Sequence, residues 1–243
     1  MVIREFAKIG KRMIRQVSGY VEKYIQVEKD PTEIETIKEE SFTYVVQKYR
    51  LSKSQILQFL YYHFCSVDER GVIRDVSEKE VANALDVTIR TVRNNNVVLE
   101  QCGLIFHSRS GMGINVMLVD YQSYHQEDGS GYLQLSYGRF QELIAIDNVN
   151  ALRVEIRKEL IYDNYEAKRK FKKDHSPCVI SFNDFKTFAP KYTHYQGMIK
   201  NIVEKGTSAF KTIVKDAYIF FDKVTSYKNG KELREEKIET YSD

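Results

Sequence analysis

Four neighbouring side chains have the chemistry that is needed to recognise the edges of base pairs. Arg90 and Arg93 carry long guanidinium donors, and Asn94 and Asn95 carry carboxamides. Guanidinium groups pair with O6 and N7 of guanine, and carboxamides pair with N6 and N7 of adenine in the major groove. The cluster therefore predicts contact with double-stranded DNA if one narrow element presents all four side chains on its outer side.

A helix over residues 89–101 would supply that element. Thr88 is a typical N-cap residue, Val92 and Leu99 mark an inner face at helical spacing, and Gly103 ends the helix at the C′ position. The length and the polar outer side of this helix are those of a recognition helix that enters the major groove.

Three further polar positions of this helix have separate roles. Thr88 and Thr91, at its start, would donate hydrogen bonds to flanking phosphates. Asn96 falls on the inner side, where such helices usually bury an aliphatic side chain. Its amide is either hydrogen-bonded in the core or a sign of a rotated helix. A solvated helix face that merely carries Arg and Asn is the alternative interpretation.

The neighbouring segments predict a helix-turn-helix followed by a wing. Residues 52–55 and 77–80 have the capping-box pattern, and each opens an amphipathic segment. Residues 86–88 form the turn before the recognition helix, and residues 104–119 are typical of a two-stranded hairpin. This order of elements is that of a winged helix-turn-helix over residues 52–121.

The tip of this hairpin carries a second set of polar side chains. Arg109 is suited to a minor groove or to a phosphate, with His107 as a supporting polar group. A solvated loop arginine is equally consistent with the pattern.

The order of elements repeats in the second half of the chain, which predicts a second, degenerate winged helix. A capping-box pattern at residues 193–196 opens a helix that Gly206 ends. A dimerisation unit with a basic surface is the alternative. The predicted elements are a strand (residues 132–137), a long helix (151–173), a short strand (179–182), a short helix (184–188), a capped helix (193–206) and a hairpin (209–221). The side chains suited to phosphate contact in this unit are Lys191, His194, Gln196, Lys200 and Asn201.

The N-terminal region alternates apolar and polar residues, as a strand does. Residues 20–27 are the clearest case, with turns expected at Gly10 and at Ser18-Gly19. Residues 42–49 form a short apolar run compatible with a helix or a strand. The N-terminal region is therefore expected to be a strand-rich extension.

The predicted fold class is α+β, with tandem winged helix-turn-helix domains and a strand-rich N-terminal extension. Residues 126–131, rich in Gly, Ser and acidic side chains, predict a linker and a domain boundary. The predicted divisions are the extension (residues 1–40), the first winged helix (41–125), the second winged helix (132–224) and a polar tail (225–243).

The composition is that of a globular protein with a packed core. Of 243 residues, 42% are hydrophobic and 29% are charged, and the net charge is only +3. Positive charge is concentrated in residues 151–215, which hold twice as many Lys and Arg as Asp and Glu. Because there is no long apolar run and no signal-peptide pattern, we expect a cytoplasmic protein, associated with a plasmid or the nucleoid, with no membrane partner.

The sequence patterns of common enzymes are missing from the chain. It has no Gly-x-x-x-x-Gly-Lys phosphate loop, and its five histidines never fall in a His-x-His or His-x-x-x-His pair. Cys65, Cys102 and Cys178 stand far apart, which predicts buried thiols rather than a metal site. We therefore expect a non-catalytic protein without a metal or cofactor.

Three local motifs carry a resemblance to a known family. They are TIRTVRN at residues 88–94, LEQCGLI at residues 99–105 and GYLQLSYGRF at residues 131–140. With the strand-rich N-terminal region, they resemble the RepL-type replication proteins of small plasmids from Firmicutes, which are winged-helix proteins. The two-unit layout also looks like the initiators of theta-replicating plasmids, in which both units contact repeated origin sequences. Either resemblance implies origin binding without intrinsic catalysis.

The predicted function is sequence-specific binding of double-stranded DNA at a plasmid or phage origin or operator, as a non-catalytic replication initiator or regulator. A transcriptional repressor or activator needs the same docking surface and is an open alternative. A winged-helix protein–protein interaction module is another. The expected partners are duplex DNA and host replication or transcription proteins, and a homodimer would match inverted repeats.

Overall fold

The computed structural model describes residues 3–28, 42–125, 131–172 and 176–224, and its fold class is α+β, as predicted. Within these residues eight α-helices are combined with four small antiparallel sheets. The helices are α1 (Lys11–Val17), α2 (Lys53–Phe64), α3 (Glu78–Leu85), α4 (Ile89–Gln101), α5 (Tyr137–Ile144), α6 (Val149–Lys172), α7 (Phe182–Phe188) and α8 (Gln196–Glu204). The strands are β1 (Phe6–Gly10), β2 (Val21–Glu28), β3 (Phe42–Tyr49), β4 (Val72–Val76), β5 (Ile105–Arg109), β6 (Ile114–Leu118), β7 (Tyr132–Ser136), β8 (Cys178–Ser181), β9 (Phe210–Lys215) and β10 (Tyr218–Lys223).

Local capping explains where α2, α3 and α4 begin. The Ser52 hydroxyl accepts the Gln55 amide, and the Gln55 side chain accepts the Ser52 amide, so the first predicted capping box is confirmed. Ser77 caps α3 by accepting the Glu80 amide. Asp86 then adopts a left-handed φ of 51° and ends α3, which turns the chain into α4. The helix predicted over residues 89–101 is also confirmed.

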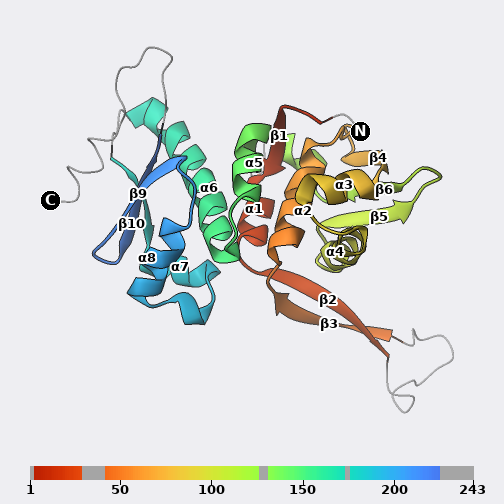
Figure 1. Cartoon of the computed structure of the whole chain (residues 1–243), viewed down its shortest axis with the longest axis horizontal. Coiled ribbons are helices and arrows are strands. Elements are labelled where there is room, and N and C mark those ends of the chain that lie inside the picture. Colours follow the sequence, from red (N-terminus) through yellow and green to blue (C-terminus); the bar gives the residue numbers. More distant parts are fainter. Residues whose placement is uncertain (1–2, 29–41, 126–130, 173–175, 225–243) are drawn as a thin grey trace.

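The same order of elements occurs twice along the chain. The first unit runs α2–β4–α3–α4–β5–β6, and the second runs α6–β8–α7–α8–β9–β10. Each sheet places its last strand between the other two, in the orders β4-β6-β5 and β8-β10-β9. Figure 1 shows the two units at opposite ends of the molecule, with α1, α5 and α6 between their sheets.

The capping box expected at residues 193–196 is wrong. Thr193 ends a short 3-10 helix, η3 (Lys191–Thr193), and its hydroxyl donates to the Pro190 carbonyl at 2.6 Å. Tyr195 occupies the N-cap position of α8 and makes no side-chain capping bond. Because the hydroxyl is satisfied within its own turn, it is not available to the next helix.

The N-terminal region contains a helix as well as strands. The strand predicted at residues 20–27 is confirmed as β2, and residues 42–49 form its antiparallel partner β3. Gly10 is not a turn between strands, because it joins β1 directly to α1. A Cβ at Gly10 would lie 2.2 Å from the Tyr124 ring, so this position needs glycine. Residues 29–41, where the acidic end of the predicted extension falls, lie outside the described residues.

Contacts cross the boundary that was expected at residues 126–131, most of which lies outside the described residues. β7 pairs with β1, with Ala7 opposite Leu135. Phe140 of α5 packs on Phe64 of α2, with ring centroids 5.0 Å apart. β7 and α5 therefore share the core of the first unit, and the repeated order of elements begins at α6. The predicted tail at residues 225–243 also lies outside the described residues.

A buried ionic network connects α5 to the second unit. Arg139 Nη2 lies 2.7 Å from Glu155 Oε2, and Arg139 Nε lies 2.5 Å from Glu159 Oε1. Arg139 Nη1 also donates to the Thr207 hydroxyl, and Lys158 Nζ lies 2.7 Å from Glu155 Oε1. The network fixes α5 against α6 and against the loop that follows α8.

Candidate nucleic-acid interface

The outer side of α4 is an exposed stripe of four residues at helical spacing, which we term the α4 face. It consists of Arg90, Arg93, Asn94 and Val97. Within the described part of the chain, the side chains of Arg90 and Asn94 have no hydrogen-bond or ion-pair partner, so their donors are free to bind a ligand. Val97 was not predicted, because an aliphatic residue in an amphipathic helix is usually assigned to the core. Its spacing from Arg90 and Asn94 was the available signal.

Thr88 and Thr91 lie at the start of α4, beside this face. Thr88 Oγ1 accepts the Thr91 amide at 3.1 Å, and the two hydroxyl oxygens are 2.9 Å apart. One hydroxyl hydrogen is used between them, which leaves the other free to donate outward. Together with the unpaired amides of the first helical turn, this arrangement suits an anion.

Asn95 does not belong to the α4 face, and its predicted base contact is wrong. It is 3% exposed, and its Nδ2 donates to Gln58 Oε1 of α2 at 3.0 Å. Each residue of a helix is rotated by about 100° from the one before it, so Asn95 points toward α2 while Asn94 points outward. Asn95 lies three residues after Val92 and four before Leu99, so its spacing from the inner face was the available signal for its burial.

Asn96 is hydrogen-bonded in the core, which is one of the two alternatives that the sequence left open. Its Oδ1 accepts Gln58 Nε2 at 2.7 Å and the Tyr62 hydroxyl at 2.6 Å. Burial raises the pKa of Tyr62 well above its ordinary value, so the hydroxyl stays protonated and donates. These bonds replace the apolar packing that an aliphatic residue would provide.

Arg93 is exposed but occupied. Its Nε lies 3.0 Å and 2.9 Å from the two carboxylate oxygens of Glu78, and its Nη2 lies 2.7 Å from Oε2. Glu78 is in the first turn of α3, so the pair connects the two helices of the turn. Base recognition by Arg93 would require this pair to open.

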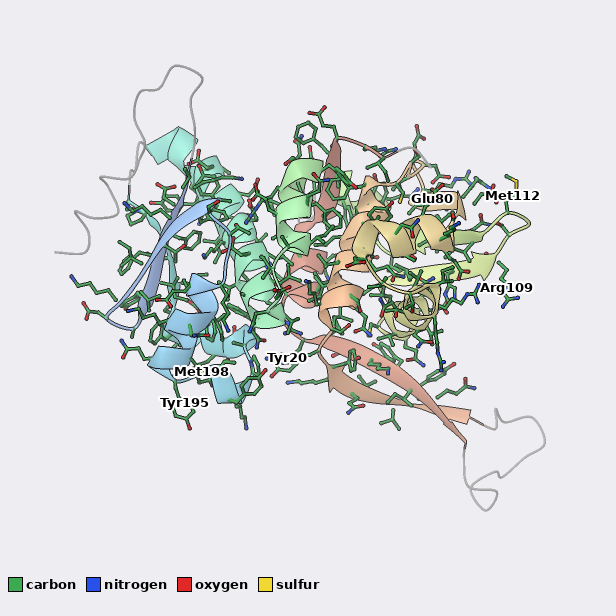
Figure 2. The ribbon with its side chains drawn as sticks, in the orientation of Figure 1. Tyr20, Glu80, Arg109, Met112, Tyr195 and Met198 are labelled. Carbon is green, nitrogen blue, oxygen red and sulfur yellow. The ribbon has the colours of Figure 1, made fainter. Side chains whose placement is uncertain are left out.

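The β5–β6 hairpin projects beside α4 and carries Arg109 and Met112 near its tip (Figure 2). Arg109 is exposed, and Met112 is 82% exposed. A Cβ at Gly113 would lie 2.3 Å from the Val76 carbonyl oxygen, so the hairpin approaches the end of β4 closely. His107 does not lie at the tip, because its Nδ1 is 3.1 Å from Glu100 Oε2 of α4.

The corresponding face of the second unit is also exposed. Tyr195 and Met198, 74% and 42% exposed, mark it in Figure 2 and were not predicted. His194 is half-buried, and its Nε2 lies 3.0 Å from the Ala189 carbonyl oxygen, so it is turned away from this face. The exposed predicted residues are Lys191, Gln196, Lys200 and Asn201. This surface offers donors and rings but no carboxylate among those positions.

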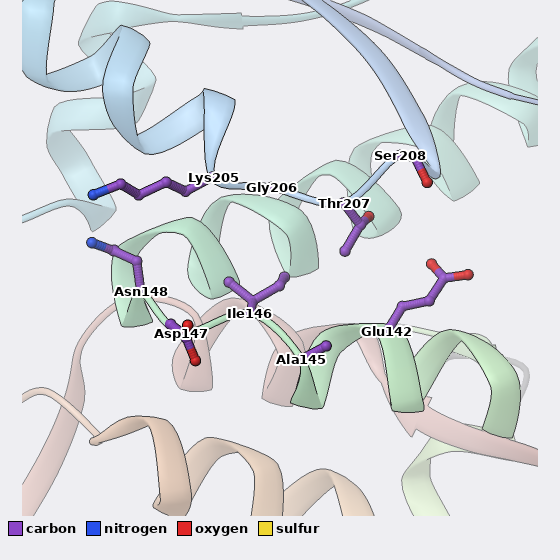
Figure 3. Close-up of a pocket in the computed structure, with 9 residues that line it drawn as sticks. All are labelled: Glu142, Ala145, Ile146, Asp147, Asn148, Lys205, Gly206, Thr207 and Ser208. Carbon is purple, nitrogen blue, oxygen red and sulfur yellow. The ribbon is translucent and has the colours of Figure 1, made fainter.

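A hollow of about 770 Å³ lies between the end of α5 and the loop after α8 (Figure 3). Glu142 and Asp147 lie on one side of it, and Lys205 lies on the other. Glu142 is engaged by Arg139 at 2.7 Å. The charges of this hollow are therefore mixed and partly neutralised.

Comparison of the chain with protein-family models, with curated proteins and with solved structures finds no match. Across the residues that the structure describes, no helix is long and apolar enough to cross a membrane. Within the same ranges, no three His, Cys, Asp or Glu side chains gather as a metal site would require.

Proposed function

We propose that this protein binds double-stranded DNA sequence-specifically through a winged helix-turn-helix formed by α2, α3, α4 and the β4-β6-β5 sheet. The observation that carries the proposal is the α4 face. On it, Arg90 and Asn94 lie on adjacent helical turns, and their donors have no partner among the described residues. A tight turn joins this helix to α3. A helix presented in this way fits the major groove, and a hairpin at its side reaches the neighbouring backbone or minor groove.

Each residue of the surface then has a distinct role. Arg90 pairs with guanine and Asn94 with adenine, while Val97 offers a methyl contact to thymine. Thr88 and Thr91 donate to phosphates, and Arg109 of the hairpin inserts beside the backbone. Arg93 contacts DNA only after it leaves Glu78.

The second unit, in this proposal, is a degenerate winged helix whose α8 side adds phosphate contacts from Lys191 and Lys200. Two such units on one chain suit a site of repeated or extended sequence, as in a plasmid or phage origin or operator. The resemblance of residues 88–94 and 99–105 to RepL-type proteins favours a non-catalytic replication initiator, and a transcriptional regulator would use the same surface. Host replication or transcription proteins are the corresponding second partners.

The test is selection of bound fragments from random duplex DNA with the wild type and with Arg90→Ala and Asn94→Ala. We expect one enriched motif in the wild type, and a loss of about 1–3 kcal/mol of discrimination at one position of the motif in each variant. Arg74→Ala and Asn83→Ala are matched controls, because both residues are exposed in the same unit but lie on β4 and α3. They should leave the motif unchanged. An absence of enrichment at low salt would overturn the proposal.

A further inference from the structure

Four arginines gather where α1 and the start of α2 meet α6. Arg153 and Arg157 lie one turn apart on α6, Arg15 is in the last turn of α1, and Arg50 lies just before the α2 N-cap. Within the described ranges, none of the four makes an ion pair or a hydrogen bond with a carboxylate. We term this group the arginine seat.

Neutral groups hold the members of the seat in place. Arg50 stacks over the Tyr20 ring at 4.0 Å, and Arg157 lies over the Phe188 ring at 5.0 Å. A Cβ at Gly19 would lie 3.2 Å from Arg157 Nη2, so the chain passes closely over this guanidinium. Three Nη2 atoms donate to backbone carbonyl oxygens. Arg50 donates to Phe188 at 2.9 Å, Arg153 to Leu51 at 2.5 Å and Arg157 to Arg15 at 2.9 Å.

No carboxylate among the described residues pairs with the positive charge of the seat. Burial lowers the pKa of Arg153 to about 10, with a further contribution from the charge of Arg50. Burial lowers the pKa of Arg157 to about 10 as well, with a further contribution from Arg15. Four buried donor atoms have no hydrogen-bond partner among the described residues, namely Nε and Nη1 of Arg50, Nε of Arg153 and Nε of Arg157. Carbonyl groups orient these side chains, but an anion is needed to offset the free-energy cost of burying several positive charges close together.

We propose that the arginine seat binds a phosphate group, and that its occupant is the sugar–phosphate backbone of a DNA duplex that passes between the two units. Arg15 is exposed and makes the direct contact, Arg50 and Arg157 are half-buried and flank it, and Arg153, 4% exposed, contributes its charge from below. Tyr20, which stacks on Arg50, lies in Figure 2 near the base of β2, between Met198 of the second unit and the helices of the first. A duplex that runs from the α4 face toward α8 would pass near this point. The choice of DNA as occupant rests on the proposed function.

Arg15 is the residue to vary, because its exposed side chain makes no hydrogen bond within the described residues and its substitution should leave the fold intact. We expect Arg15→Gln to reduce the slope of log affinity against log salt by about one, and to weaken binding of duplex DNA about fivefold at physiological salt. Arg15→Glu should weaken binding further. Arg74→Gln and Arg74→Glu make the same changes of charge on β4 and should bind as the wild type does. Fluorescence anisotropy of a labelled duplex over a range of salt gives both quantities.

A second measurement separates the seat from DNA binding itself. Inorganic phosphate should raise the unfolding temperature of the wild type and of Arg74→Glu more than chloride of equal ionic strength does, and it should lose this effect in Arg15→Glu. If the wild type binds duplex DNA and the Arg15 variants have the same affinity and salt slope as the Arg74 variants, binding of DNA at the arginine seat is overturned and the proposed function stands. If the wild type does not bind duplex DNA, the proposed function fails. In that case, a rise in unfolding temperature with phosphate that occurs only in proteins with Arg15 still supports an anion site at the seat. An equal rise in all variants overturns the anion site.

Discussion

Arg93 of α4 and Glu78 of α3 form a fork in which two guanidinium nitrogens meet one carboxylate, with the shortest N–O distance at 2.7 Å. The pair stabilises the angle between the two helices of the turn, and at the same time it removes one cation from the α4 face. Under the proposed function, DNA would have to compete with Glu78 for Arg93, so the carboxylate would limit non-specific attraction to phosphate. Recognition would then depend more on Arg90 and Asn94, whose donors have no partner among the described residues.

Replacement of Glu78 by Gln should release Arg93. We expect the affinity for duplex DNA of any sequence to rise about fivefold at physiological salt, which corresponds to one additional phosphate contact. Titration of an unrelated duplex at several salt concentrations measures the change. Glu69→Gln removes the same charge from an exposed position away from Arg93. If both variants gain affinity equally, net charge explains the effect and the fork does not restrain Arg93.

The Asn96 network predicts different effects for two adjacent asparagine substitutions. Asn96→Ala leaves the Gln58 amide and the Tyr62 hydroxyl without their shared acceptor, which should cost about 1–3 kcal/mol of unfolding free energy. Asn94→Ala, on the exposed side of the same helix, should change stability by about 0.5 kcal/mol or less. Urea unfolding measures both values. Similar small losses in the two variants would show that the buried network contributes little.

The sequence predicted the elements of the first unit well because their signals are local. The capping box at Ser52 and the N-cap at Thr88 depend on residues three positions apart, and Gly103 follows the helix with a φ of +63°. In the second unit, the hairpin predicted over residues 209–221 is found as β9 and β10, and Asp216 in its turn has a left-handed φ of 48°.

The errors arose where tertiary partners decide the outcome. Asn95 has the same side chain as its neighbour Asn94, and nothing close to it in the sequence indicates that its amide will bond to Gln58 of α2, although its spacing from Val92 and Leu99 places it on the inner face. Likewise, nothing near Arg93 in sequence indicates that Glu78 will hold it, since the two are fifteen positions apart. The pairing of β7 with β1 joins distant segments, which is why a boundary near residues 126–131 was expected although contacts cross it.

His63 predicts a loss of stability in mild acid. It is fully buried on α2, where its Nδ1 lies 2.9 Å from the Phe59 carbonyl oxygen and its Nε2 has no hydrogen-bond partner in the described part of the chain. The rings of Tyr121 and Tyr124 lie nearby, with His63 stacked on Tyr124 at 6.2 Å. Burial lowers the pKa of His63 from 6.5 to about 4. The neutral ring with a proton on Nδ1 is therefore the form that fits the core.

The sign of the effect follows from proton uptake. Below its ordinary pKa the unfolded chain binds a proton at His63, while the folded chain does not until about pH 4. Stability is therefore complete above pH 6.5 and falls as the pH approaches 4. We expect a contribution of about 2 kcal/mol to be lost between about pH 7.5 and about pH 5. The difference in unfolding free energy between the wild type and His63→Leu should shrink by this amount, and a constant difference over the same range would contradict the prediction.

Arg139 should be the most sensitive position at the junction of α5 and α6. It is 7% exposed and contacts Glu155 and Glu159, which are both buried. Its removal leaves two carboxylates close together, and among the described residues Lys158 and Lys223 are the cations left to pair with them. Because an uncompensated buried charge is costly, we expect Arg139→Ala to lose about 3–5 kcal/mol of unfolding free energy.

Two further variants separate charge from packing at Arg139. Arg139→Met keeps most of the side-chain volume but not the charge, so it should be nearly as unstable as Arg139→Ala. Glu142→Gln removes the half-exposed partner of Arg139 and should cost about 1 kcal/mol or less, because solvent screens that pair. If Arg139→Met is as stable as the wild type, the arginine acts by filling space. The network would then not be what fixes α5 against the second unit, and apolar contacts along α6 would have to account for that connection.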